Sequence, residues 1–312
     1  MSKASNSVGR IGSAWGWGWE NLQFLRMRLA GLRSKEGELA SLVAEIDAYR
    51  GLYEGQSERR FDDARIFEVG YGARPLRLIA SISLGLDARG IDLDAPMLER
   101  SGAELLRILR RNGPLRFVKS SVRALVFDAH ERRALIRVLA RRGARLRLAP
   151  DRFLVGDIAT AAIAPGSVDF FYSEDVFEHI PGAALDAVCA GMARALAPGG
   201  MAVISPSVYT GICGGHLVEW YPNSFARDGV RRSEPWEHLR RRRFVADCFL
   251  NEWRVRDYRA LFEAHFDIVS VDNLKPGLGR QFLTPALRTE LAAYDEDELL
   301  SEKWRFVLRK KA

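Results

Sequence analysis

From residue 61 onward, short apolar runs alternate with longer segments in which apolar residues recur at helical spacing. The pattern predicts strands at 65–69, 88–93, 151–157, 167–173, 201–206, 265–271 and 303–310, and helices at 75–84, 95–111, 182–196 and 254–266. Strands that alternate with helices indicate a mostly parallel α/β sheet. The last strand alternates apolar with basic residues, which predicts a half-exposed edge strand.

The same pattern divides the chain. We expect residues 1–60 to form a helical N-terminal flank and 61–312 to form the main domain. Two segments fit no strand–helix unit. An insertion at about 99–151 is expected to contain amphipathic helices near 115–127 and 131–142, and a segment at about 207–253 is rich in Gly, Trp, Tyr and Arg. The second segment follows a predicted strand, and ligands bind at the carboxyl ends of strands in such sheets. We therefore expect it to recognise the substrate.

Basic residues are concentrated in the insertion. Residues 99–152 carry 14 Arg and one Lys against five acidic residues, a net charge of +10 in a chain whose total is +7. A second cluster runs from Arg240 to Arg243. Such runs are often solvated helix faces, but arginine also binds phosphate and carboxylate groups. The charge favours an acidic, phosphorylated or lipid-linked partner, or a peripheral membrane surface. Nucleic acid is less favoured, because no RNA-binding module and no interleaved aromatic residues are recognisable.

A glycine turn, EVGYGARP, joins the first predicted strand to the first helix. Gly70 and Gly72 allow a sharp bend and a close approach of a ligand, and a helix that starts near Pro75 presents its N–H groups there. Pro75 stands where a dinucleotide fingerprint needs its third glycine, and no Gly-Lys-Ser/Thr ending of a P-loop follows. The turn therefore matches neither an NAD site nor a P-loop.

Five motifs in order resemble those of the class I S-adenosylmethionine-dependent methyltransferases. They are EVGYG, GIDLD, LVGD, SVDFFYSEDVFEHIPG and ARALAPGGMAVISP. The resemblance implies a doubly wound, Rossmann-like α/β sheet of seven mostly parallel strands, with S-adenosylmethionine as cofactor. It implies that the turn makes room for the methionine part, that Asp92 binds the ribose hydroxyls and that Asp157 faces the adenine amine. The predicted cofactor-binding residues are Glu68, Gly70, Tyr71, Gly72, Asp92, Leu93, Asp157, Ile158, Ser173 and Glu174. One residue departs from the family pattern: Arg74 replaces a small residue, so either the turn is adapted or this side chain points toward a substrate.

Methyl transfer from a sulfonium is an in-line displacement, so the enzyme chiefly aligns acceptor and methyl group. A hydroxyl acceptor also needs a general base that titrates near neutral pH. His179 and His216 are the candidate bases, with Glu219 beside the second, although each could instead serve packing alone. His216 and Glu219 could assist a divalent metal, but two ligands are too few, and no metal site is predicted. The remaining histidines, His130, His238 and His265, are expected at the surface or on helices.

The expected activity is O-methylation of a small-molecule or saccharide acceptor, as in polysaccharide biosynthesis. The alternatives are an RNA or protein methyltransferase and a non-catalytic binding or scaffold protein, for which Arg74 is the only support. The cysteines are widely spaced, and no signal or membrane-spanning run is recognisable. We therefore expect a cytoplasmic protein, including one at the inner membrane surface, and the pattern leaves its oligomeric state open. Trp15, Trp17 and Trp19 are expected to dock the N-terminus onto the domain.

Overall fold

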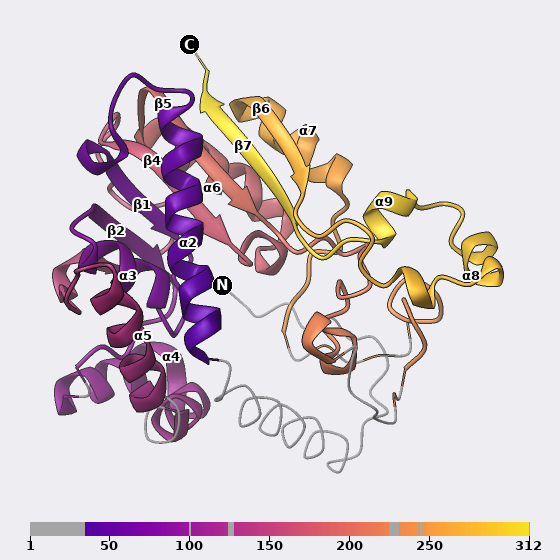
Figure 1. Ribbon diagram of the computed structural model, residues 1–312, viewed down its shortest axis with the longest axis horizontal. Helices are drawn as coiled ribbons and strands as arrows, with labels where there is room; N and C mark the ends of the chain where they lie inside the picture. The colour runs from indigo at the N-terminus through magenta and orange to yellow at the C-terminus, as the bar shows by residue number, and fades with distance from the viewer. Residues whose placement is uncertain are drawn as a thin grey trace. The chain divides into compact units, whose positions relative to one another are not determined.

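The computed structural model describes residues 35–99, 101–123, 128–224, 231, 233–242, 244, 246 and 248–311. Seven strands in this part of the chain form one sheet in the order β3-β2-β1-β4-β5-β7-β6 (Figure 1). They are β1 (Arg65–Val69), β2 (Asp87–Asp92), β3 (Phe153–Val155), β4 (Val168–Glu174), β5 (Leu196–Ser205), β6 (Phe266–Asn273) and β7 (Trp304–Lys310). The predicted α/β class with a seven-stranded, mostly parallel sheet is confirmed.

The chain separates into two compact units. Among the described residues, the N-terminal unit contains those of 35–173, 188–203 and 309–311, and the C-terminal unit contains those of 174–187 and 204–308. Trp15, Trp17 and Trp19, which were predicted to dock the N-terminus, lie outside the described residues. No helix in the described part of the chain is long and apolar enough to cross a membrane.

The N-terminal unit is built around β1, which pairs in parallel with β2 on one side and β4 on the other. Its helices are α2 (Lys35–Glu54), α3 (Leu76–Ser83), α4 (Gly102–Arg123) and α5 (Ala129–Arg141). Tyr49 of α2 stacks on Tyr172 of β4 with ring centroids 5.1 Å apart, and Phe61 meets Phe170 edge-on at 5.3 Å. Because these rings are buried, α2 packs into the core of the unit.

The insertion folds onto this unit through its charges. α4 changes direction at Gly113, and α5 packs beside α2. Arg142 binds the carboxylate of Asp47 with both terminal nitrogens, at 2.7 and 2.8 Å, and Arg137 binds Glu36 at 2.7 Å. The helix predicted at 131–142 is confirmed as α5, and residues 124–127 of the other lie outside the described residues. Some of the arginines of the basic insertion therefore bind acidic residues of helix α2 in the same chain.

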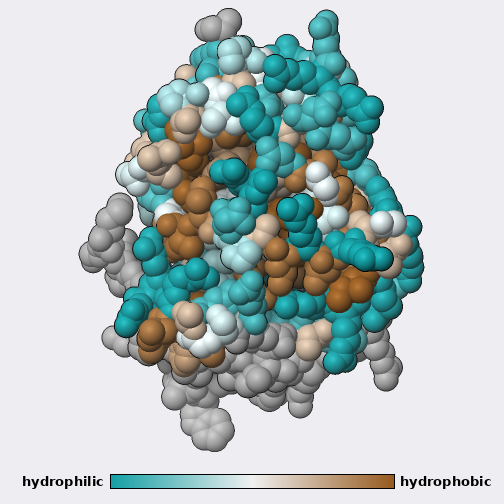
Figure 2. Space-filling view, turned by 90° about the vertical axis from the view of Figure 1, so that its left-hand side faces the viewer, coloured by the Kyte–Doolittle hydropathy of each residue, from teal (hydrophilic) through white to brown (hydrophobic). Residues whose placement is uncertain are grey.

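One face of the molecule shows hydrophobic and hydrophilic side chains intermingled (Figure 2). Large apolar side chains exposed in the N-terminal unit are Leu93, Leu106, Leu109, Ile136 and Leu154. Leu93 has the largest exposed fraction of these, 68%.

The C-terminal unit contains the end of the sheet and a second core. Its elements include α7 (Val255–His265), α8 (Pro285–Glu290), α9 (Glu296–Leu299), the 3-10 turns η4 (Phe177–His179), η5 (Val218–Trp220), η6 (Pro222–Ser224) and η7 (Arg280–Phe282), and the first half of α6 (Gly182–Ala195). The described residues of the segment 207–253 form little regular structure, yet Trp236 is fully buried in a cluster with Trp220 and leucines of 283–300. Trp220 and Trp236 therefore serve packing.

The last strand is not an edge strand, so that prediction was wrong. β7 lies between β5 and β6, and an antiparallel bridge joins Ser207 after β5 to Lys303 before β7. Arg305 looked exposed in the sequence but forms an ion pair at 3.1 Å with Asp272 of β6. A charged residue paired across two strands gives the same alternation as a solvent-facing one.

His238 also departs from expectation, because it is buried and not on a helix. Its Nε2–H donates to the carbonyl of Tyr209 at 2.8 Å. Burial lowers the pKa of His238 to about 4, so the ring is neutral at physiological pH. His130 and His265 lie on α5 and α7, as predicted.

Glu178, on η4, is a buried carboxyl whose two oxygens find no hydrogen-bond donor in the described part of the chain. Burial raises its pKa well above the ordinary value, and the neighbouring charge of Asp175 raises it further. Glu178 is therefore held in its protonated form over a wider pH range than a glutamate in water.

The packing of α3 on β2 requires glycine at position 90. A Cβ on Gly90 would lie 2.8 Å from Leu78 Cδ2, 3.0 Å from Tyr71 Cδ1 and 3.1 Å from the carbonyl of Glu68. We expect Gly90→Ala to destabilise the protein by about 1–3 kcal/mol, measured by thermal unfolding followed by circular dichroism. Gly37→Ala is the control, because an added Cβ meets nothing within 4 Å there; it should stabilise by about 0.5–1 kcal/mol. Equal or higher stability of Gly90→Ala would contradict this account.

Glu178→Gln should raise the melting temperature at pH 8. The folded-state pKa of Glu178 is raised, so its unfavourable contribution appears as the pH rises above the pKa of the unfolded chain and is complete above the folded pKa. We expect a gain at pH 8 of about 2–4 °C for each kcal/mol recovered, shrinking toward zero near pH 4. Glu263→Gln, on the exposed side of α7, is the matched control and should show no such pH dependence. A pH-independent difference for Glu178→Gln would contradict the raised pKa.

Candidate active site

The turn between β1 and α3 has the conformation that its glycines predict. Gly70 (φ 80°) and Gly72 (φ 66°) both adopt the left-handed region. The N–H of Gly70 donates to the carbonyl of Ile91, and that of Gly72 to Oδ2 of Asp92, both at 2.8 Å. A Cβ on Gly72 would meet no heavy atom within 4 Å. The turn is thus fixed to the end of β2 and leaves space beside its backbone.

Asp92, at the end of β2, has a fixed carboxylate. Its Oδ2 accepts from Gly72, and its Oδ1 accepts from the N–H of Asp94 at 2.8 Å. Leu93, between the two aspartates, is the apolar side chain with the 68% exposed fraction. An apolar side chain left in water beside a fixed carboxylate suits a ligand with both polar and apolar parts.

Asp157 lies at the same end of the sheet as Asp92. β2 and β3 pair in parallel, with Asp92 opposite Val155, and the N–H of Gly156 donates to the carbonyl of Asp92 at 2.8 Å. Asp157 follows two residues after Val155, and its Oδ1 accepts from the N–H of Ala159 at 2.9 Å. The fold therefore gathers the glycine turn and both predicted aspartates at the carboxyl ends of neighbouring strands.

The other predicted cofactor residues of this unit turn their side chains into the fold. Glu68 accepts from the hydroxyl of Tyr172 at 3.1 Å, and Ser173 Oγ donates to the carbonyl of Val69 at 2.8 Å. The Tyr71 hydroxyl donates to the carbonyl of Leu154 at 2.8 Å, and Ile158 is buried. Any contact of Tyr71, Ile158 or Ser173 with a cofactor would use backbone atoms.

The side chain of Arg74 forms an ion pair with a residue of α5. Its Nη1 lies 2.6 Å from Oε1 of Glu131, a buried carboxylate that Lys35 also approaches at 3.3 Å. The turn is thus adapted to the larger residue, which was one of the two possibilities that the sequence left open. The ion pair fastens the turn to the insertion.

In the C-terminal unit, Glu174 at the tip of β4 is held by a lysine that the sequence gave no reason to select. Lys303 Nζ lies 3.1 Å from Glu174 and 2.7 Å from Asp175. Burial opposes the charge of Lys303, but the two carboxylates raise its pKa above the ordinary value, so it stays protonated.

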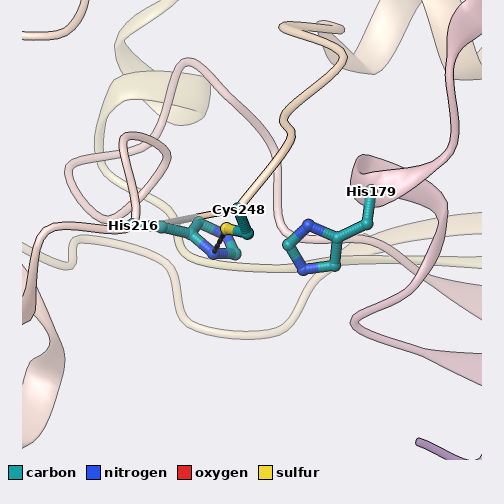
Figure 3. Close-up of side chains that lie close together, drawn as sticks. All are labelled: His179, His216 and Cys248. Atoms are coloured by element: carbon teal, nitrogen blue, oxygen red, sulfur yellow. Dashed lines mark hydrogen bonds between the residues drawn. The ribbon is translucent and has the colours of Figure 1, made fainter. Parts of the chain in front are cut away.

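His179 and His216 lie together in the C-terminal unit, although they come from different segments. Their ring centroids are 5.0 Å apart and the rings are perpendicular. The exposed thiol of Cys248 joins them, with Sγ 3.7 Å from Nδ1 of His216. Figure 3 shows the three side chains pointing toward one another from separate stretches of backbone. Cys248 carried no sequence signal, because an isolated cysteine far from either histidine has no motif.

The side chain of Glu219 binds Ser233. Its Oε1 accepts from the N–H of Ser233 at 2.8 Å and from the same residue's hydroxyl. Two arginines of the 240–243 cluster are also engaged: Arg240 binds Glu290 at 2.6 Å, and Arg242 binds Glu252 at 2.5 Å. Arg243 lies outside the described residues.

Comparison with known proteins agrees with the motifs. Residues 131–204 match a protein-family model described as a methyltransferase domain. Comparison with curated proteins gave no match.

Among solved structures, the chain resembles the PH0226 protein of Pyrococcus horikoshii OT3 (12% identity, 86% of this chain and 90% of that one, TM-score 0.44). It also resembles geranyl diphosphate C-methyltransferase of Streptomyces coelicolor A3(2) (13%, 85% and 76%, 0.41). A third is an S-adenosylmethionine-dependent methyltransferase of Mesorhizobium loti (16%, 82% and 95%, 0.41).

The family match begins in α5 and ends in β5. It therefore includes Asp157, which follows β3, and Ser173 and Glu174, which end β4. The sheet order and the glycine turn were observed independently of this match. Residues 131–204 are therefore similar to a methyltransferase domain, in agreement with the sequence motifs that resemble those of the class I S-adenosylmethionine-dependent methyltransferases.

Proposed function

We propose that the enzyme transfers the methyl group to an oxygen atom of a small-molecule acceptor, with a saccharide as the favoured class. The observation that carries this proposal is the pair of imidazoles, His179 and His216, 5.0 Å apart in the C-terminal unit. A hydroxyl is a weak nucleophile until its proton is removed, and a neutral imidazole accepts a proton near physiological pH. Tyr221 lies beside His216 with ring centroids 6.1 Å apart, which adds an aromatic wall.

The cofactor would bind to the N-terminal unit. The open space beside Gly72 suits the methionine part, and the oriented carboxylate of Asp92 suits two ribose hydroxyls. Leu93 would lose its exposure under the adenine ring. These assignments combine the observed geometry with the family resemblance.

An acidic or phosphorylated acceptor is supported by Arg231. Its guanidinium lies over the rings of Trp220 and Phe282, at 5.0 and 4.8 Å from their centroids. A guanidinium that contacts two aromatic rings is preoriented, and its planar fork of N–H groups matches carboxylate and phosphate groups. The arginines of the insertion give weaker support to an RNA acceptor, because Arg137 and Arg142 already bind carboxylates of α2. Peripheral membrane contact remains a prediction of the charge alone.

Calorimetric titration with S-adenosylmethionine and S-adenosylhomocysteine tests the cofactor site. We expect micromolar binding by wild type and a loss of about tenfold to a hundredfold in Asp92→Ala, because hydrogen bonds to a charged group disappear. Asp151→Ala is the control, since this aspartate is exposed and lies just before β3. Circular dichroism checks that Asp92→Ala is folded. Equal affinity of a folded Asp92→Ala and wild type would refute the ribose assignment.

The acceptor is tested by release of S-adenosylhomocysteine with panels of saccharides, sugar phosphates, amines and RNA. We expect turnover with a hydroxyl-bearing small molecule, and His216→Gln should lower kcat by about 10²–10⁴-fold while cofactor affinity is unchanged. His265→Gln, on α7, serves as the matched control. Turnover confined to RNA, with binding that falls steeply as salt increases, would favour the RNA methyltransferase instead.

A further inference from the structure

We propose that His179, His216 and Cys248 bind one divalent transition-metal ion, with Zn²⁺ as the best match. Each residue offers one ligand atom, and these atoms all lie within 4.8 Å of one another. The described part of the chain contains this one group of three or more possible metal-binding side chains. The sequence could name only His216 and Glu219 as ligands; the fold instead gathers a second imidazole and a thiolate donor.

The separation between two of the ligand atoms already fits a shared ion. Zinc lies about 2.0–2.1 Å from an imidazole nitrogen and about 2.3 Å from a thiolate sulfur, so a tetrahedral site separates nitrogen and sulfur by about 3.6 Å. His216 Nδ1 and Cys248 Sγ are 3.7 Å apart. A tetrahedral zinc site separates two imidazole nitrogens by about 3.3 Å, so the atoms of this group, all within 4.8 Å of one another, would have to close by at most about 1.5 Å. A small side-chain adjustment is therefore enough.

The orientation of His179 also fits coordination. Its Nδ1 lies 2.9 Å from the carbonyl of Phe249, to which it must donate, so the lone pair of the neutral ring is on Nε2. Metal-binding histidines commonly donate their other N–H to a carbonyl, which fixes the ring and the tautomer. Phe249 follows Cys248 directly in the chain, so one segment both supplies the thiol and orients this imidazole.

The backbone of His216 is held in an unusual conformation. Its φ is 54°, in the left-handed region that non-glycine residues rarely adopt, and its N–H donates to the carbonyl of Cys213 at 2.8 Å. Strained backbone of this kind concentrates at functional sites, where the surrounding structure maintains it. Here it directs the imidazole toward Cys248 and His179 (Figure 3).

The donor set selects the class of metal. Two imidazoles and a thiolate suit zinc and related transition metals, whereas Mg²⁺ and Ca²⁺ prefer oxygen ligands. Three protein ligands leave a fourth position for water or for an oxygen or sulfur atom of a substrate, as in catalytic zinc sites.

The role of the ion, unlike its binding, rests on the proposed function. An acceptor hydroxyl in the fourth position would become more acidic, so that its proton passes to solvent and its oxygen keeps the electron pair. The imidazole lone pairs would then be used for coordination, and His179 and His216 would act as ligands in place of bases.

The test uses the full-length protein, stripped with a chelator and titrated calorimetrically with Zn²⁺. We expect one ion per chain, and at least tenfold weaker binding in Cys248→Ser, His179→Gln and His216→Gln. Cobalt substitution should give a thiolate-to-cobalt charge-transfer band that Cys248→Ser lacks. His265→Gln, which removes a histidine outside the group, should bind zinc like wild type.

No stoichiometric binding by wild type, or equal zinc affinity and the same cobalt spectrum in Cys248→Ser, would overturn the proposal. S-adenosylmethionine binding is measured in the same samples. The proposed cofactor site lies in the N-terminal unit. A variant that loses zinc binding but keeps cofactor binding therefore has a defect of the metal site alone, whereas loss of cofactor binding in wild type would count against the proposed function.

Discussion

The turn between β1 and α3 exists in this form because two of its residues lack a Cβ. With Gly70 and Gly72 both left-handed, their N–H groups reach Ile91 and Asp92, so the turn and the end of β2 become one piece. The absence of a side chain at Gly90 lets α3 approach the same strand. Three glycines thus place the oriented carboxylate beside an open stretch of backbone.

The charges of this protein show why composition alone overstates an outside partner. The insertion has a large excess of arginine, but α5 uses part of it to bind carboxylates of α2, and Arg74 uses Glu131 to anchor the glycine turn. The exposed pairs between α5 and α2 each contribute little to stability. Their value lies in orientation, since several pairs between the same two helices fix how the insertion docks on the N-terminal unit.

Features that depend on nearby residues could be predicted from the sequence. The buried strand β1, the glycine turn and helix α5 each follow from spacing within a few residues, and the family motifs supplied the cofactor. Features that depend on distant partners could not. Arg305 gives an exposed pattern, yet Asp272 pairs with it, and His238 is buried by residues that no local pattern identifies. Cys248 meets His216 from 32 positions away, so no spacing rule could connect them.

The cluster in the C-terminal unit supports two chemical roles, and its geometry weighs them differently. As a base, one imidazole would be sufficient, and the hydrogen bond from His179 to Phe249 would simply fix its tautomer. That role would use Cys248 only to orient the ring of His216. A metal ion uses both imidazoles and the thiolate, and the nitrogen–sulfur separation of 3.7 Å already matches the tetrahedral spacing of about 3.6 Å. Coordination therefore explains more of the observed arrangement than proton transfer to histidine does.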